Sequence, residues 1–272
     1  MSRVRLTKIA APSNPPASTA ELYYDTTDSK LEAIDASGNR LRLGGFATSD
    51  YRLVQIVHIY LTATGYTPSA GVRALFVQAL GAGGQGGGAL NGATNAAGGG
   101  GGAGAYAEDW ITAGVAGHGA YTIQVGVGGS GAAAGNTAGN NGTSTFFDTN
   151  VVTANGGTGG AGMANVAVPN IGAAGGLGGA ASNQPNGVQS GFALAGAAGD
   201  RGVIQAAGTA FSGKGADSIW GGGGISAVAD GTGNNAVGYG GGGSGGLVLS
   251  SGAVARAGGT GFAGLLVIWE YA

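Results

Sequence analysis

The stretch "LFVQALGAGGQGGG", Leu75 to Gly88, joins an apolar run of strand character to a run of glycines. Its segment from Gly81 to Gly86 satisfies G-x-G-x-x-G, the pattern of a dinucleotide-binding turn. Such a turn must open a helix, and the following residues, "GGALNGATNAAGGGGGAG", have no helical periodicity. At this glycine frequency, chance alone gives roughly three or four such matches. The stretch therefore predicts a strand that passes into another kind of glycine structure.

Composition sets the class of the protein. The 272 residues include 64 glycines, 6 prolines and no cysteine, and the net charge is -2. The chain lacks the G-X-Y period of collagen. After Arg52 it carries four basic and seven acidic residues, too few to solvate a flexible coil, so we expect the glycines to be ordered. The weak charge predicts no nucleic-acid partner, and no apolar run approaches the ~20 residues that membrane insertion needs.

Strand-like runs flank the glycine-rich part. The apolar runs "YRLVQIVHIYLTATG", "VRALFVQALG", "GAYAEDWITA", "GAYTIQVGVGG", "STFFDT" and "VVTANGG" precede it, and "GLLVIWEYA", residues 264–272, closes the chain as a predicted central core strand. Glycine without Cβ atoms can form polyproline II helices that pack side by side and hydrogen-bond to one another. The predicted fold is all-β: a β-sandwich with an inserted polyglycine II helix bundle over residues 51–272.

The first fifty residues differ in composition. Together with Arg52 they contain 13 of the 24 charged residues of the chain, and they contain few glycines. "NPPASTA" indicates an extended linker, and "ELYYDTTDSKLEAIDASGNRLRLGG" alternates between apolar residues and turn residues. We therefore predict a small three-stranded β-meander in a separate domain, residues 1–50, which packs on a partner because so small a meander is marginal alone.

Catalytic and cofactor sites have little support in the residues. His58 belongs to an apolar strand, His118 belongs to a turn, and neither has a partner at metal-ligand spacing. Glu108 and Asp109 are adjacent, so they point to opposite faces of a strand and cannot form a carboxylate pair. We expect no enzyme activity, no cofactor and no metal site.

Apolar and aromatic residues interrupt the glycine runs where loops are expected. Such residues form contact surfaces, although they can equally fill gaps between the helices and the sandwich. Trp110 and Trp269 lie in strand patterns and are predicted to be core residues. The candidate ligand-contact residues, of which Trp220 is the first choice, are Trp220, Phe192, Phe211, Tyr239 and Met163.

The order of the motifs resembles a known family. "LTATGYTPSAGVRALFVQALGAGGQGGG", "GGGGGAGAYAEDWI", "YTIQVGVGGSG" and "GTGFAGLLVIWEYA" follow one another as in the glycine-rich domain of bacteriophage tail fibres and tail-tip adhesins. "PPASTAELYYDTTDSKLEAIDASGNRLRLG" is similar to a short N-terminal module of phage virion proteins. The resemblance implies a polyglycine II bundle whose loops bind a bacterial surface receptor, either a polysaccharide or an outer-membrane protein. It also implies attachment to another tail protein through residues 1–50, usually as a homotrimer.

The expected function is therefore that of a phage tail fibre or tail-tip protein, located in the virion tail and assembled in the host cytoplasm. It would bind the host surface without catalysis. The main alternative is a purely structural virion component, such as a fibre cap or baseplate part. An ice-binding protein would show regular tripeptide repeats on a flat face, and a capsule depolymerase would need paired carboxylates; the sequence favours neither.

Overall fold

The computed structural model describes residues 8–9, 20–25, 30–35, 40–45, 52–59, 65–112, 114–148, 151–166, 170–183, 191–250 and 254–272. The chain divides into two compact units, Met1–Arg52 and Leu53–Ala272. The described residues form strands and extended segments and contain no helix, so the all-β prediction is confirmed. Nothing in this part of the chain could therefore cross a membrane as a helix.

The first unit contains the predicted meander. Strands β2 (Ala20–Asp25), β3 (Lys30–Asp35) and β4 (Arg40–Gly45) pair antiparallel in that order. A short strand, β1 (Lys8–Ile9), pairs in parallel with β2, which the sequence did not predict. The predicted linker before β2 and the two predicted turns lie outside the described residues.

The described residues of the second unit form four sheets. A five-stranded sheet has the order β14-β8-β6-β18-β5, and a four-stranded sheet has the order β13-β11-β10-β9. Smaller sheets are β12-β15-β16 and β17-β7. The strand bounds are β5 Leu53–Ile59, β6 Ala74–Leu80, β7 Ala96–Ala97, β8 Tyr106–Ile111, β9 Ile123–Gln124, β10 Thr145–Phe147, β11 Val152–Ala154, β12 Asn170–Ile171, β13 Ala181–Asn183, β14 Phe192–Leu194, β15 Val203–Ala206, β16 Thr209–Phe211, β17 Leu247–Val248 and β18 Leu265–Tyr271.

The two larger sheets share one apolar core. The five-stranded sheet contributes Leu75, Val77 and Ile268, and the four-stranded sheet contributes Phe147 and Val152, all fully buried. The C-terminal strand β18 pairs antiparallel with β6 on one side and with β5 on the other. Its predicted place as a central strand is confirmed, because a strand this apolar needs both neighbours to cover it.

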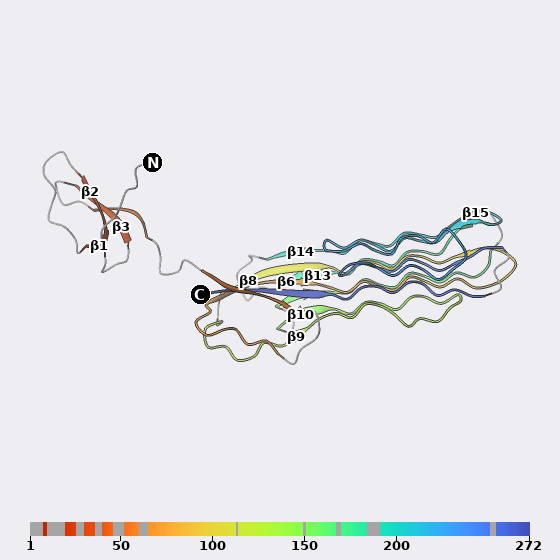
Figure 1. The fold of residues 1–272 in the computed structure, drawn as a ribbon, viewed down its shortest axis with the longest axis horizontal. Coiled ribbons are helices and arrows are strands. Elements are labelled where there is room, and N and C mark those ends of the chain that lie inside the picture. The colour runs from red at the N-terminus through yellow and green to blue at the C-terminus, as the bar shows by residue number, and fades with distance from the viewer. Residues whose placement is uncertain are drawn as a thin grey trace. The chain divides into compact units, whose positions relative to one another are not determined.

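Long segments without strand pairing leave these sheets and run side by side, with β8, β6 and β10 at one end and β15 at the other (Figure 1). Their backbone hydrogen bonds repeat every three residues. Segment 81–89 donates in rotation to 97–105, 137–143 and 256–264. The donor–acceptor pairs, at 2.8–2.9 Å, are Gly84 to Gly102, Gln85 to Asn140, Gly86 to Gly259, and then Gly87 to Gly99, Gly88 to Thr137 and Ala89 to Arg256.

The same segment also accepts hydrogen bonds from three further segments, 126–130, 155–163 and 240–247. The donors are Gly129, Gly160 and Gly243, each at 2.9 Å. Segment 81–89 thus has a hydrogen-bonded neighbour on every side, and all of its residues are buried. A three-residue repeat of partners belongs to polyglycine II helices packed in a bundle, which is the arrangement that the glycine content predicted.

Three segments form the centre of this bundle. Gly84 donates to Gly102, Gly101 donates to Gly243, and Gly243 donates back to Gly84, at 2.8–2.9 Å. Segments 81–89, 97–105 and 240–247 therefore contact one another in a triangle, and the other segments surround them. Buried backbone groups must find partners, and here they find them in neighbouring segments of the same chain.

The close packing leaves no room for Cβ atoms at the points where the segments touch. A Cβ added to Gly86 would lie 1.9 Å from the carbonyl oxygen of Ser244, and one added to Gly104 would lie 1.9 Å from that of Gly81. The G-x-G-x-x-G segment is part of this packing. The N–H groups of Gly81, Gly83, Gly84 and Gly86 all donate to backbone carbonyls, so they are not available to a phosphate group.

A buried carboxylate fixes the C-terminal strand. Glu270 of β18 is fully buried and accepts hydrogen bonds from the hydroxyl of Tyr66, the backbone N–H of Ser69 at 3.0 Å and Nε2 of Gln55 at 2.7 Å. Burial alone would raise the pKa of Glu270, but these hydrogen bonds outweigh it, and the pKa is lowered from its ordinary value of 4.5. The carboxylate therefore connects β18 to β5 and to the loop before β6.

We expect Gly86→Ala to destabilise the second unit by about 3 kcal/mol or more, because backbone at 1.9 Å cannot move aside without breaking hydrogen bonds of the bundle. The matched control is Gly119→Ala, where nothing lies within 4 Å of the added Cβ. The control should leave stability unchanged or raise it slightly. Urea unfolding followed by circular dichroism measures both, and equal stability of the two variants would contradict the packing described above.

The stability due to Glu270 should depend on pH. A carboxyl group whose pKa is lowered by folding stabilises fully above its unfolded pKa, and this contribution is lost as the pH falls through the folded pKa. Glu270→Gln should therefore be less stable than the natural chain at pH 7, by about 1–3 kcal/mol. The difference should shrink below about pH 4. Urea unfolding between pH 7 and pH 3 tests this, and a difference that does not change with pH would contradict it.

Candidate functional site

The outer face of the five-stranded sheet, which points away from the shared core, carries aromatic and polar side chains. The pairing registers place Leu194, Tyr106, Leu80 and Leu265 in one row across the strands. The next row is Phe192, Glu108, Gln78, Val267 and His58, and the third is Trp110, Phe76, Trp269 and Ile56. Side chains alternate between faces along each strand, so these rows share the face opposite the buried core.

Tyr106 lies at the centre of an aromatic group at the bundle end of this face. Its ring centroid is 5.4 Å from that of Trp220 and 6.4 Å from that of Phe192. Trp220 and Phe192 are 36% and 53% exposed, whereas Tyr106 is 6% exposed. The structure thus brings together two of the candidate contact residues, from distant parts of the chain, on a buried tyrosine.

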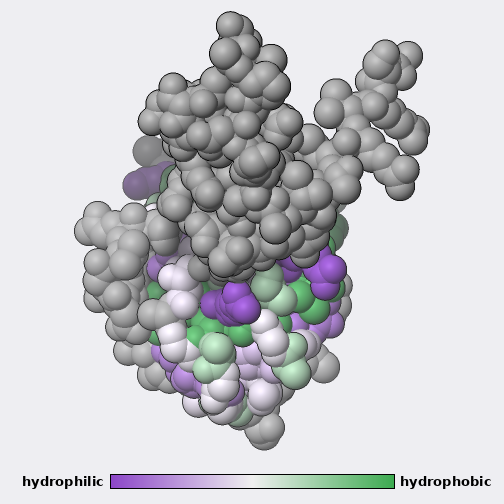
Figure 2. Space-filling view, turned by 90° about the vertical axis from the view of Figure 1, so that its left-hand side faces the viewer, coloured by the Kyte–Doolittle hydropathy of each residue, from purple (hydrophilic) through white to green (hydrophobic). Residues whose placement is uncertain are grey.

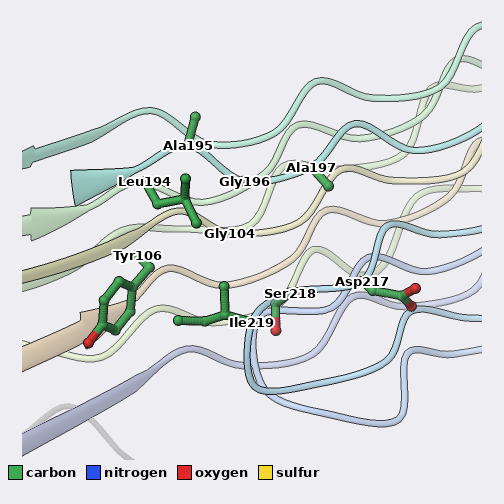
Figure 3. Close-up of a pocket in the computed structure, with 9 residues that line it drawn as sticks. All are labelled: Gly104, Tyr106, Leu194, Ala195, Gly196, Ala197, Asp217, Ser218 and Ile219. Atoms are coloured by element: carbon green, nitrogen blue, oxygen red, sulfur yellow. The ribbon is translucent and has the colours of Figure 1, made fainter. Parts of the chain in front are cut away.

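A pocket of about 200 Å³ adjoins Tyr106, between the start of β8, residues 194–197 and residues 217–219. Its lining includes Tyr106, Leu194, Ile219 and Asp217. Figure 3 shows the side chain of Ile219 directed towards Tyr106 and the carboxylate of Asp217 directed away from it. The pocket beside Tyr106 is therefore mainly apolar.

The turn that carries Trp220 is held by its neighbours. Oδ1 of Asp217 accepts the N–H of Gly223 at 2.7 Å, and Oδ2 pairs with Nζ of Lys214 at 2.5 Å. The hydrogen bond from Lys214, with that from Gly223, lowers the pKa of Asp217. Oγ of Ser218 accepts the N–H of Trp220 at 3.1 Å. These bonds set the position of Trp220 and give Asp217 two partners.

A polar network occupies the middle of the face. The hydroxyl of Tyr106 donates to Oε2 of Glu108, and Nε2 of Gln78 donates to the Tyr106 hydroxyl at 2.7 Å and to Glu108 at 3.3 Å. Nε1 of Trp269 donates to Oε1 of Gln78 at 3.1 Å. Burial, followed by the hydrogen bond to Glu108, raises the pKa of Tyr106. The tyrosine therefore remains protonated and fixes the carboxylate.

The third row is also aromatic. Trp110 is 37% exposed, and its ring lies 5.2 Å from that of Phe76 and 4.9 Å from that of Tyr271. The prediction that Trp110 is a core residue is wrong. The buried residue is its neighbour Asp109, because the strand alternation puts Asp109 on the inner face. Trp269 packs at the edge of the outer-face cluster around Leu80.

The other candidate residues lie elsewhere or are covered. Tyr239 packs on the cluster around Leu80 and meets the ring of Phe262 at 5.2 Å. Phe211, 38% exposed, belongs to β16, which pairs with β15, and β15 lies at the opposite end of the bundle (Figure 1). Met163 is buried in a second cluster with Ile204 and Leu247, so its predicted role as a contact residue is not supported. Methionine fills irregular gaps well, which explains this position.

Sequence reasoning missed Glu108, Gln78 and Trp110 as members of one surface. The sequence did contain a signal for this surface. Tyr106, Glu108 and Trp110 are every second residue of one strand, so their side chains lie on one face. Seen from the sheet end, hydrophobic and hydrophilic residues lie directly beside one another (Figure 2).

Among the described residues, no group of three or more potential ligands could hold a metal ion. The arrangement can bind a ligand through aromatic rings and a fixed carboxylate.

Comparison with known proteins agrees with the glycine packing. No curated protein is similar enough to count as a relative. The family model described as "Glycine-rich domain" matches residues 61–271, which is most of the chain and includes strands β6 to β18 and the central segments of the bundle. The chain therefore belongs to this glycine-rich domain family.

Proposed function

We propose that this protein is a phage tail fibre or tail-tip protein that binds the surface of the host cell without catalysis. The observation that carries the proposal is the exposed aromatic group of Trp220 and Phe192, held on Tyr106 at the end of a rigid bundle. Exposed aromatic residues on a fixed scaffold are the usual anchors of binding surfaces. The resemblance of the motifs to phage adhesins supplies the biological setting.

The architecture of the chain supports this role in two ways. The bundle is held by backbone hydrogen bonds throughout, so it can present side chains with little loss of entropy on binding. The separate meander in residues 1–52 provides a module for attachment to another tail protein. Assembly as a homotrimer would multiply weak contacts through avidity.

Replacement of both Trp220 and Phe192 by alanine should weaken binding of the labelled full-length chain to bacterial cells by about 30-fold or more, as expected for the loss of aromatic anchors. The measurement is a titration against a panel of bacterial strains, read by flow cytometry. The matched control is Phe211→Ala, an aromatic residue with similar exposure at the other end of the bundle.

A natural chain that binds no strain, or a double variant that binds as well as the natural chain, would contradict this adhesion surface. The first result would favour the alternative role as a structural part of the virion. Thermal unfolding of each variant separates a loss of binding from a loss of folding.

A further inference from the structure

In the part of the chain that the structure describes, the three rows of the outer face contain one carboxylate, that of Glu108, and one of its two oxygens is already engaged. Its Oε2 atom accepts hydrogen bonds from Tyr106 and Gln78, and Gln78 is itself held by Trp269. Among the described residues, Oε1 of Glu108 has no hydrogen-bond partner. A carboxylate that is anchored through one oxygen can offer the other to a ligand without losing its orientation.

Exposed rings flank this carboxylate. Phe192, on β14, stands directly across from Glu108 in the sheet register, and Trp110 follows two residues later on β8. The ring of Trp110 packs against those of Phe76 and Tyr271. Glu108 and Trp110 are two residues apart on one strand, which corresponds to about 7 Å. The face thus presents an exposed ring, a carboxylate and a second exposed ring next to one another.

This arrangement differs from the centre of a protein–protein contact, which is normally apolar and surrounded by a polar rim. Here the centre is the polar network of Glu108 and Gln78, and the rings stand around it. A pyranose has the complementary pattern, because its C–H faces pack on aromatic rings while its hydroxyl groups need fixed acceptors and donors. The rows defined by the strand registers contain no lysine or arginine that would attract an acidic sugar.

We propose that the strip formed by Phe192, Glu108, Gln78 and Trp110 binds a neutral saccharide with adjacent hydroxyl groups. The sugar ring packs on Trp110 or Phe192, one hydroxyl donates to Oε1 of Glu108, and the oxygen-rich side of the sugar faces Gln78. This inference rests on the proposed adhesion function and names the chemical class of the receptor. It identifies Glu108 as the residue that selects hydroxyl groups.

The test uses a bacterial strain that the natural full-length chain binds. Mild periodate cleaves the carbon–carbon bond between adjacent hydroxyl groups, so cells treated with it should lose at least about 10-fold in binding. Cells treated with protease should bind as well as untreated cells. Glu108→Gln and Trp110→Ala should each weaken binding by about 10-fold, since one loses a charged acceptor and the other an aromatic platform.

Leu177→Ala is the matched control, since this residue is 69% exposed on an outer segment of the bundle and makes no part of the strip. Binding that survives periodate but is lost after protease treatment would overturn the saccharide proposal in favour of a protein receptor, and adhesion itself would stand. Unchanged binding by both Glu108→Gln and Trp110→Ala would also overturn it. Thermal unfolding of each variant must match that of the natural chain for the comparison to count, and Glu108→Asp provides a second variant if the amide fails to fold.

Discussion

Backbone hydrogen bonds between extended segments that pack too closely for side chains hold the second unit together. Segment 81–89 shows the principle, since its successive N–H groups turn to different neighbours and its carbonyls accept from others. Ordering glycine is costly, and a bundle of this kind offsets the cost by satisfying nearly every buried backbone group. Glycine at the contact points is therefore a steric requirement: backbone oxygens already occupy the places where Cβ atoms would lie.

The same steric requirement decides where functional side chains can lie. The bundle interior excludes most side chains, so functional groups must lie at its ends, where segments become strands or turns. Strands β8, β6 and β18 are neighbours in the sheet. β6 leads into segment 81–89, β8 follows segment 97–105, and β18 follows segment 256–264. Side chains reappear at this junction, and the aromatic group of Tyr106, Phe192 and Trp220 forms there.

Two carboxylates illustrate the different uses of the two faces of this sheet. Glu270 is buried on the inner face and both of its oxygens accept hydrogen bonds from donors of the same chain, so it contributes to stability. Glu108 is part of the outer face and only one of its oxygens is engaged by the described residues. Each is held by a tyrosine hydroxyl. Glu270 therefore stabilises the fold, whereas Glu108 keeps one oriented hydrogen-bond acceptor at the surface.

The sequence alone determined the all-β class, the glycine bundle and strand Leu265–Tyr271, because missing Cβ atoms and continuous apolar runs act locally. It also pointed to Trp220 and Phe192, since aromatic residues are conspicuous among glycines. It could not show which segments are neighbours, because bonds between glycine backbones carry no side-chain signal. It placed Trp110 inside and Met163 outside for a related reason: alternation along a strand does not say which face is covered. Only the tertiary structure decided that, because the second sheet buries the inner face, whereas the outer face keeps Trp110 and Phe192 exposed beside a smaller buried cluster.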